Sequence, residues 1–416
     1  MLSFIKKLGP GMLFAGAAIG VSHLVQSTRA GADFGFGLIW ALLLVNIFKY
    51  PFFQFGPRYA MATGESLIEG YRKLSKGVLL TYFLLTFATM FTIQTAVTIV
   101  TASLASYVVF EFQPIQFASF TITSIQIWTV LILLICTIIL VVGRYKLLDK
   151  LMKIIILVLT ISTITAVFAS ASKTEVALTF GQIFPEKSQW IFLIAFMGWM
   201  PAPMDISVWH SVWALEKQKQ TKNFDKKTSL FDFNIGYLAT IILGLGFLAL
   251  GAFVLYNSGE SLSTSASGFA EQLIVLYTKS LGNWSYLIIG IAALTTMFST
   301  TLTTFDASPR VMSKTSNLIF NINLKHGYIV WLALLFLGTI IIFFFLTSEL
   351  GFLVKTATVL SFLTAPFYAI INFKLIMSKH VPTIWKPNFL LQILSWLGII
   401  FLIGFGIWYL LILNTI

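Results

Sequence analysis

Apolar runs recur along the whole chain and alternate with short polar stretches. A helix needs about 20 apolar residues to cross the hydrocarbon core of a bilayer, so each run predicts a membrane-spanning helix. We predict eleven such segments, at residues 9–31, 37–57, 78–108, 121–142, 149–171, 190–213, 233–256, 284–305, 327–347, 350–373 and 390–413. The pattern indicates an all-α polytopic membrane protein whose residues 1–416 form a single transmembrane domain.

Two of these segments are interrupted by small and polar residues near their middle. The first break is Gly20–His23 in segment 9–31, and the second lies within Met197–His210 in segment 190–213. Polar, irregular backbone at membrane depth is expensive unless it is buried in protein or lines a cavity. Paired broken helices are typical of a transporter's binding site, which we therefore expect between these two segments.

The positions of the two breaks divide the chain into similar halves. Residues 9–171 and 190–373 would each hold five helices and begin with the broken one, while 390–413 would add a final helix. This arrangement predicts an inverted repeat of the leucine-transporter type, although the halves show no direct sequence identity.

Composition and charge agree with a membrane protein. The chain is 58% hydrophobic and 10% charged, which excludes an ordinary soluble domain. Of 27 basic residues, 21 fall in the loops that would be cytoplasmic and three in the outer loops. This bias predicts a cytoplasmic N-terminus and an outer C-terminus in a bacterial cytoplasmic membrane. The net charge is +12, but the distribution of this charge over the loops argues against nucleic-acid binding. The lone Cys136 excludes a disulfide framework.

Several motifs resemble a known family. They are Gly9, Pro10 and Gly11 at the start, the stretch Phe34–Trp40, then Arg58, Thr63 and Gly64, and finally His210 and Ser211. These motifs resemble the natural resistance-associated macrophage protein (NRAMP) family of divalent-metal transporters, most specifically over the first 65 residues. The resemblance implies a leucine-transporter-type fold and secondary active transport.

The chain departs from that family where the family binds metal. The family carries Asp-Pro-Gly-Asn at the first break and Met-Pro-His in the sixth helix. Here Gly20–His23 and then Pro203, Met204 and Asp205 stand at those places, and Val78–Val108 contains no Asp or Glu. We therefore predict a divergent member that lacks the usual metal-binding motifs and is not a typical transition-metal carrier.

We expect the solute to bind between the two breaks, at Gly20, Ser22, His23, Met200, Pro203, Met204 and Asp205, with Arg29 in the outer vestibule. Without the family's carboxylate, the site suits a small anion such as bicarbonate, since half-helix N-termini attract anions. Three alternatives stay open. His23 and Asp205 could hold a divalent metal with a Met thioether, His23 could bond a helix-6 carbonyl, and Asp205 could cap a helix. Arg29 could also extend to the outer headgroups.

Hydroxyl side chains dominate the eighth segment near its end. In the leucine-transporter-type fold that the resemblance implies, hydroxyls here meet carbonyls of the first break at a sodium site, which would hold Gly20, Ser299, Thr300 and Thr303, although such hydroxyls often bond their own helix. Sodium is thus the expected coupling ion, with a proton as the alternative.

The leading function is a secondary transporter of a small solute, expected to be a monomer in the lipid bilayer without a cofactor. One alternative is a divalent metal cation transporter of the Mn, Fe or Mg type with an altered site. A second is a non-transporting sensor that kept the fold. No zinc motif and no set of nucleophile, base and acid is present in the sequence, so we do not expect an enzyme.

Overall fold

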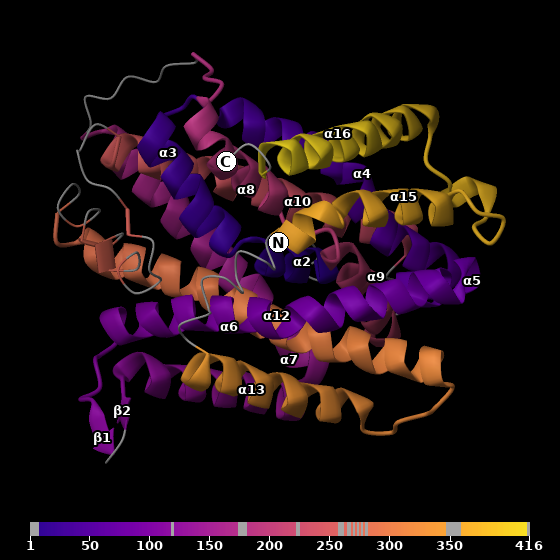
Figure 1. Ribbon diagram of the computed structural model, residues 1–416, viewed down its shortest axis with the longest axis horizontal. Helices are drawn as coiled ribbons and strands as arrows, with labels where there is room; N and C mark the ends of the chain where they lie inside the picture. The colour runs from indigo at the N-terminus through magenta and orange to yellow at the C-terminus, as the bar shows by residue number, and fades with distance from the viewer. Residues whose placement is uncertain are drawn as a thin grey trace.

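The computed structural model describes residues 8–117, 120–173, 181–221, 225–256, 282–346 and 359–413, together with a few residues between 262 and 278, and is built mainly of helices (Figure 1). The elements are α2 Pro10–Ala18, η1 Ser22–Ser27, α3 Thr28–Phe34, α4 Ile39–Thr63, α5 Leu67–Leu74, α6 Lys76–Val108, β1 Ile115–Phe117, β2 Phe120–Ile122, α7 Ser124–Ala171, η2 Lys187–Gln189, α8 Trp190–Trp199, α9 Ile206–Gln220, α10 Lys226–Val254, α12 Ser285–Phe320, α13 Gly327–Phe345, α15 Ala365–Ile376, η4 Thr383–Trp385 and α16 Phe389–Leu413. The short strands β1 and β2 pair antiparallel, with Ile115 opposite Ile122.

Eight of the described helices are long and apolar enough to cross a membrane. One of them, α7, covers residues 124–142 of the predicted segment 121–142 and all of the segment 149–171, and the chain turns between the two at Arg144 (φ 50°, ψ −160°). Of the predicted segment 350–373, residues 350–358 lie outside the described part of the chain. The count of eleven crossings and the division into two repeats stay predictions.

Segments 1 and 6 are broken, as the sequence predicts. In the first, α2 ends at Ala18 and the π-helix η1 already begins at Ser22. The irregular stretch is therefore shorter than expected, and Ser22 and His23 lie in the first turn of the second half-helix. In the sixth, α8 ends at Trp199 and α9 begins at Ile206.

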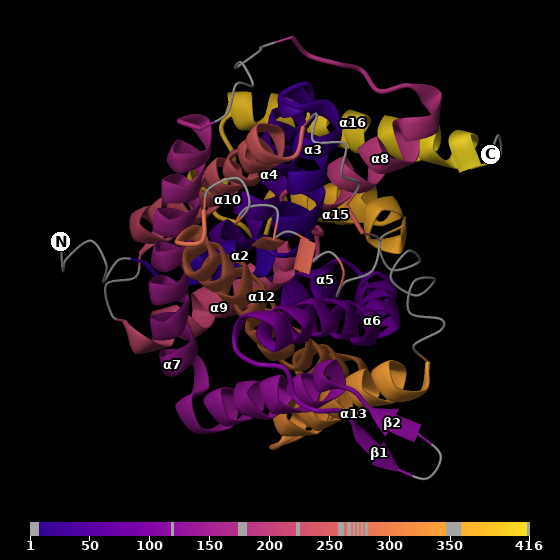
Figure 2. The same ribbon diagram turned by 90° about the vertical axis from the view of Figure 1, so that its left-hand side faces the viewer.

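The half-helix α2 lies in the interior, where α7, α9, α10 and α12 all contact it (Figure 2). All of its residues are buried. Its approach to α10 requires glycine on both sides, since a Cβ on Gly11 would lie 2.0 Å from the Asp232 carbonyl oxygen and one on Gly236 would lie 2.1 Å from the Gly11 carbonyl oxygen. The glycines thus allow two backbones to touch in the centre of the protein.

The start of α2 is held by a buried carboxylate. Asp232 accepts hydrogen bonds from the backbone N–H groups of Gly9 (2.8 Å) and Gly11 (2.7 Å), while Pro10 occupies the first turn. Beside it, Asp149 pairs with Lys217 at 2.9 Å and with Lys153 at 2.8 Å. The Gly-Pro-Gly motif therefore supplies two N–H groups to an anion from α10, which suits the positive end of a helix dipole.

Candidate functional site

The first break is closed by hydroxyl groups from α12. Thr300 Oγ1 lies 3.0 Å from the carbonyl oxygens of both Gly16 and Ile19, and Ser299 Oγ lies 3.3 Å from that of Gly16. A Cβ on Gly20 would lie 2.6 Å from Thr300 Oγ1, so only glycine allows this approach. These carbonyls end α2, and the hydroxyls satisfy groups that the helix leaves unpaired.

The structure brings together only part of the predicted sodium site. Thr300 reaches the break, whereas Ser299 Oγ lies closer to the Thr296 carbonyl of its own helix (2.7 Å) than to that of Gly16, and Thr303 Oγ1 donates to the carbonyls of Ser299 and Thr300 in its own helix. The Gly20 carbonyl accepts from the N–H groups of His23 and Leu24. The carbonyls that face the hydroxyls are therefore those of Gly16 and Ile19, not that of Gly20.

His23 is fully buried and connects the first break to α10. Its Nε2 lies 3.1 Å from the Thr240 carbonyl oxygen, which can only accept, so Nε2 carries a proton. Its Nδ1 lies 2.8 Å from Ser22 Oγ. One alternative from the sequence was that His23 bonds a backbone carbonyl of the sixth segment. His23 does contact a carbonyl, but that carbonyl belongs to α10.

Ser22 also links the two breaks. Its Oγ lies 3.0 Å from the Ala18 carbonyl oxygen and 3.5 Å from that of Pro201. We had expected the Ser22 hydroxyl to be available to a solute. Instead it is directed at protein atoms, because it lies inside a helical turn where the preceding carbonyls are close.

The second break is held by a buried lysine that the sequence analysis missed. Lys49 Nζ of α4 donates to the carbonyl oxygens of Met197 (3.1 Å), Gly198 (2.6 Å) and Met200 (2.7 Å), and the side chain is fully buried. An ammonium has three protons, and the end of a half-helix offers unpaired carbonyls with partial negative charge. A lysine in the middle of apolar segment 37–57 was the signal that could have revealed it.

Asp205 stands at the N-cap position of α9, but its side chain makes no capping hydrogen bond. Its Oδ1 is buried and has no hydrogen-bond partner within the described residues. The capping alternative is therefore wrong for this side chain. Tyr82 and Tyr368 are close enough to interact electrostatically with the carboxyl group.

Asp205 faces a small polar cavity between the second break, α6 and the helical residues 359–376. The cavity measures about 10 Å³, which is room for about one water molecule. Its lining residues are Leu85, Thr89, Pro203, Met204, Asp205, Leu360, Ser361, Thr364 and Tyr368. Pro203, Met204 and Asp205 thus share one cavity, whereas Met200 is buried and contributes its carbonyl oxygen to Lys49.

Arg29 lies half-buried in α3, beyond the break. It donates to the carbonyl oxygen of Ser263 and lies within electrostatic range of Asp33. The Arg29 side chain therefore contacts protein groups. It does not extend only to the lipid headgroups, which was the alternative from the sequence.

The third segment contains a buried amide, Gln94. Gln94 of α6 donates to Thr98 Oγ1 (3.1 Å) and to the Thr301 carbonyl (3.3 Å), and accepts from Thr304 Oγ1 (2.7 Å). Sequence analysis recorded the absence of Asp and Glu here but not this neutral link between α6 and α12.

The site offers carbonyls, hydroxyls, one imidazole, one ammonium and one carboxyl group. Within the described ranges, no group of three or more His, Cys, Asp or Glu side chains lies together in a way that could hold a metal ion. In this structure the imidazole, the ammonium and the hydroxyls contact protein groups, and the cavity at Asp205 has room for about one water molecule.

Comparison with known proteins extends this picture. A family model described as natural resistance-associated macrophage protein-like matches residues 11–412. An uncharacterised protein of Pasteurella multocida is 34% identical over 406 residues, which is 96% of this chain and 90% of the relative.

Solved structures with a similar fold include those of two transporters. A manganese transporter of Eremococcus coleocola, in complex with an aromatic bis-isothiourea compound, has a TM-score of 0.74 at 16% identity, covering 97% of this chain and 85% of that one. Mhp1, a nucleobase-cation-symport-1 family transporter, has a TM-score of 0.54 at 15% identity, covering 98% of this chain and 92% of that one.

Proposed function

This chain belongs to the natural resistance-associated macrophage protein family, and from that premise we propose that it moves a small anion rather than a transition-metal cation. It is an integral membrane protein with a leucine-transporter-type fold, a secondary transporter and not an enzyme. The observation that carries our proposal is the buried Lys49 ammonium at the second break.

The charge of Lys49 disfavours a divalent cation nearby. With an effective dielectric constant of about 20, a divalent ion about 6 Å from the ammonium would be repelled by roughly 5 kcal/mol. The same charge attracts a monovalent anion by about half as much. In addition, Lys49 already holds three carbonyls that a cation would otherwise coordinate.

Asp205 must be neutral when an anion is bound, since an ionised carboxylate would repel it. The carboxyl group is neither capping a helix nor paired with His23, whose two ring nitrogens face other groups. We therefore propose that Asp205 carries a proton in the anion-loaded state. Bicarbonate remains our best candidate for the anion.

Sodium is our proposed coupling ion, next to the first break. Four oxygens converge there, namely the carbonyls of Gly16 and Ile19 and the hydroxyls of Ser299 and Thr300. They supply hard, uncharged ligands from two separate helices, α2 and α12. A sodium ion that binds them would fix α12 against α2.

A divalent metal is the second candidate because Asp205 Oδ1 lacks a hydrogen-bond partner within the described residues and shares a cavity with Met204. A carboxylate and a thioether suit a transition metal, provided that Lys49 is displaced or neutral.

Uptake by purified protein in liposomes separates these functions. We expect wild type to take up labelled bicarbonate in a sodium gradient and to take up little manganese, and we expect Asp205→Asn, which stays neutral, to keep anion uptake. Manganese uptake that Asp205→Asn abolishes, without anion uptake, would establish the metal function. Uptake of neither solute would favour the sensor.

A further inference from the structure

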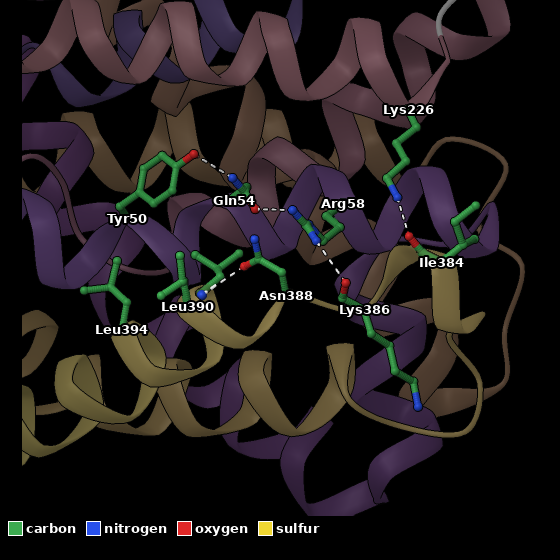
Figure 3. A pocket seen from close by; sticks show the side chains of 10 residues that line it. Tyr50, Gln54, Arg58, Lys226, Ile384, Lys386, Asn388, Leu390 and Leu394 are labelled. Carbon is green, nitrogen blue, oxygen red and sulfur yellow. Dashed lines mark hydrogen bonds between the residues drawn. The ribbon is translucent and has the colours of Figure 1, made fainter.

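A groove made of two adjoining hollows lies along the outside of α4, α10 and α16. Its first part measures about 410 Å³ and is lined by polar and basic side chains, among them Gln54, Arg58, Lys226 and Lys386 (Figure 3). Its second part measures about 390 Å³ and is mainly apolar. Tyr50 and Leu394 line both parts, so the two hollows form one groove with a basic end and an apolar end.

Arg58, Lys226 and Lys386 are among the lining residues of the basic end, which include no acidic residue, although Figure 3 shows the side chain of Lys386 leading away from Arg58 and Lys226. Arg58 donates to Gln54 Oε1 at 2.7 Å, but its Nε is buried without a hydrogen-bond partner within the described residues. Lys226 Nζ donates to the Ile384 carbonyl at 2.5 Å and lies 4.5 Å from the centre of the Trp385 ring. These contacts hold the cations in place and leave positive charge that an anion would neutralise.

The apolar end faces the surface that a bilayer would cover. Ile47 of α4 is 52% exposed and Leu238 of α10 is 51% exposed, and Ile241 continues the same lining. From Lys226 to Ile241 the groove follows α10 for about 22 Å, at 1.5 Å per residue. One leaflet of the hydrocarbon core is about 15 Å thick, so the groove is long enough for a headgroup and much of an acyl chain.

We propose that this groove binds an anionic phospholipid. The phosphate would lie near Arg58 and Lys226, with Lys386 as a further positive charge close to the headgroup, and an acyl chain would follow Ile47, Leu238 and Ile241. All three basic residues belong to the loops predicted to be cytoplasmic, where the leaflet is anionic. The combination of a basic end with an apolar continuation fits a charged lipid better than inorganic phosphate or a zwitterionic lipid.

The groove lies against helices that build the transport site. Tyr50 follows Lys49 on α4, and α10 carries Thr240, whose carbonyl holds His23. A lipid in the groove would therefore fix α4 relative to α10 and α16, and we expect bound lipid to stabilise this closed arrangement.

Native mass spectrometry of the full-length protein in mild detergent tests the proposal. We would add phosphatidylglycerol or phosphatidylcholine with identical chains and measure how much of each stays bound. Each positive side chain near a headgroup changes binding about fivefold, so Lys226→Gln with Lys386→Gln should weaken phosphatidylglycerol binding about 25-fold. The matched control removes two exposed charges elsewhere, through Lys146→Gln with Lys325→Gln, and should leave binding unchanged.

A second variant tests the apolar end separately. Leu238→Trp should weaken binding of both lipids without changing the preference for phosphatidylglycerol, and inorganic phosphate should not displace the lipid. Equal retention of the two lipids by wild type would overturn the proposal. So would unchanged binding in the double lysine variant, while displacement by phosphate alone would identify a site for free anions instead.

Discussion

The two breaks face the same physical problem and solve it with different chemistry. Each leaves the carbonyls at the end of a half-helix without helical partners. At the first break a neutral hydroxyl, Thr300 Oγ1, contacts the carbonyls of Gly16 and Ile19. At the second break the Lys49 ammonium contacts three carbonyls at the end of α8. Of the two contacts, only the one at the second break carries a formal charge, which comes from Lys49 of α4.

This difference also shows where each half-helix is anchored. The charged anchor of α2 is the Asp232 carboxylate at its start, whereas that of α8 is an ammonium at its end. In both cases the charged side chain lies at the end of the helix where the helix dipole has the opposite sign. Because the contacts at the first break are neutral and those at the second break include an ammonium, we expect the first break to open at the lower cost.

Lys49→Met should have the largest effect because it removes the charged partner of the second break. Three buried carbonyls would lose their donor, so we expect a loss of about 3 kcal/mol or more in the free energy of unfolding, and loss of uptake. Denaturant unfolding in detergent and liposome uptake are the two measurements. Lys314→Met is the matched control, because its ion pair with Glu69 (2.7 Å) is partly exposed and worth about 0–1 kcal/mol.

An equal, small loss of stability in both lysine variants would contradict this account. It would mean that water replaces the ammonium at the second break, and that the two breaks do not differ in how they are held.

Asp232→Asn should have the next largest effect, at the start of α2. An amide offers one accepting oxygen in place of two, so either Gly9 or Gly11 loses its partner and unfolding becomes easier by about 2 kcal/mol. Asp225→Asn is the control, since Asp225 caps the exposed start of α10 through Thr228 N–H (2.9 Å) and its loss should cost less than about 1 kcal/mol. A larger effect for Asp225 would argue against the buried anchor.

The sequence was sufficient to predict the two breaks, because Gly20 and the prolines at 201 and 203 lie next to small and polar residues in the middle of otherwise apolar segments. It also placed the hydroxyls of Ser299 and Thr300 near the first break. It could not predict the Lys49 contact, which joins residues 148 to 151 positions apart, or the Asp232 contact with Gly9, 223 positions apart. Nor could the sequence show that Thr300 rather than Thr303 faces the first break, because the rotation of α12 about its axis depends on packing.

His23→Leu should have an intermediate effect on the free energy of unfolding, because it removes the contact between the first break and α10. The Thr240 carbonyl would lose its donor, at about 1–2 kcal/mol, while His23→Gln can keep one N–H and should retain part of that stability. Nitrogen-15 NMR of labelled histidine provides a direct check. We expect a protonated Nε2, and finding Nε2 without a proton would contradict the hydrogen bond to Thr240.

Thr300→Val should have the smallest effect on stability and the sharpest effect on coupling. The variant keeps the side-chain shape but removes the hydroxyl that lies 3.0 Å from two carbonyls of the first break, at about 1 kcal/mol. Thr303→Val is its matched control, because Thr303 Oγ1 bonds only its own helix within the described residues and its loss should cost less.

If sodium binds at the first break, Thr300→Val must raise the sodium concentration that gives half-maximal uptake, while Thr303→Val leaves it unchanged. Equal sodium dependence in wild type and both variants would place the coupling ion elsewhere. Asp205, which lines the polar cavity, would then be the candidate site for a coupling proton. The contacts at the first break would have a structural role and would bind no ion.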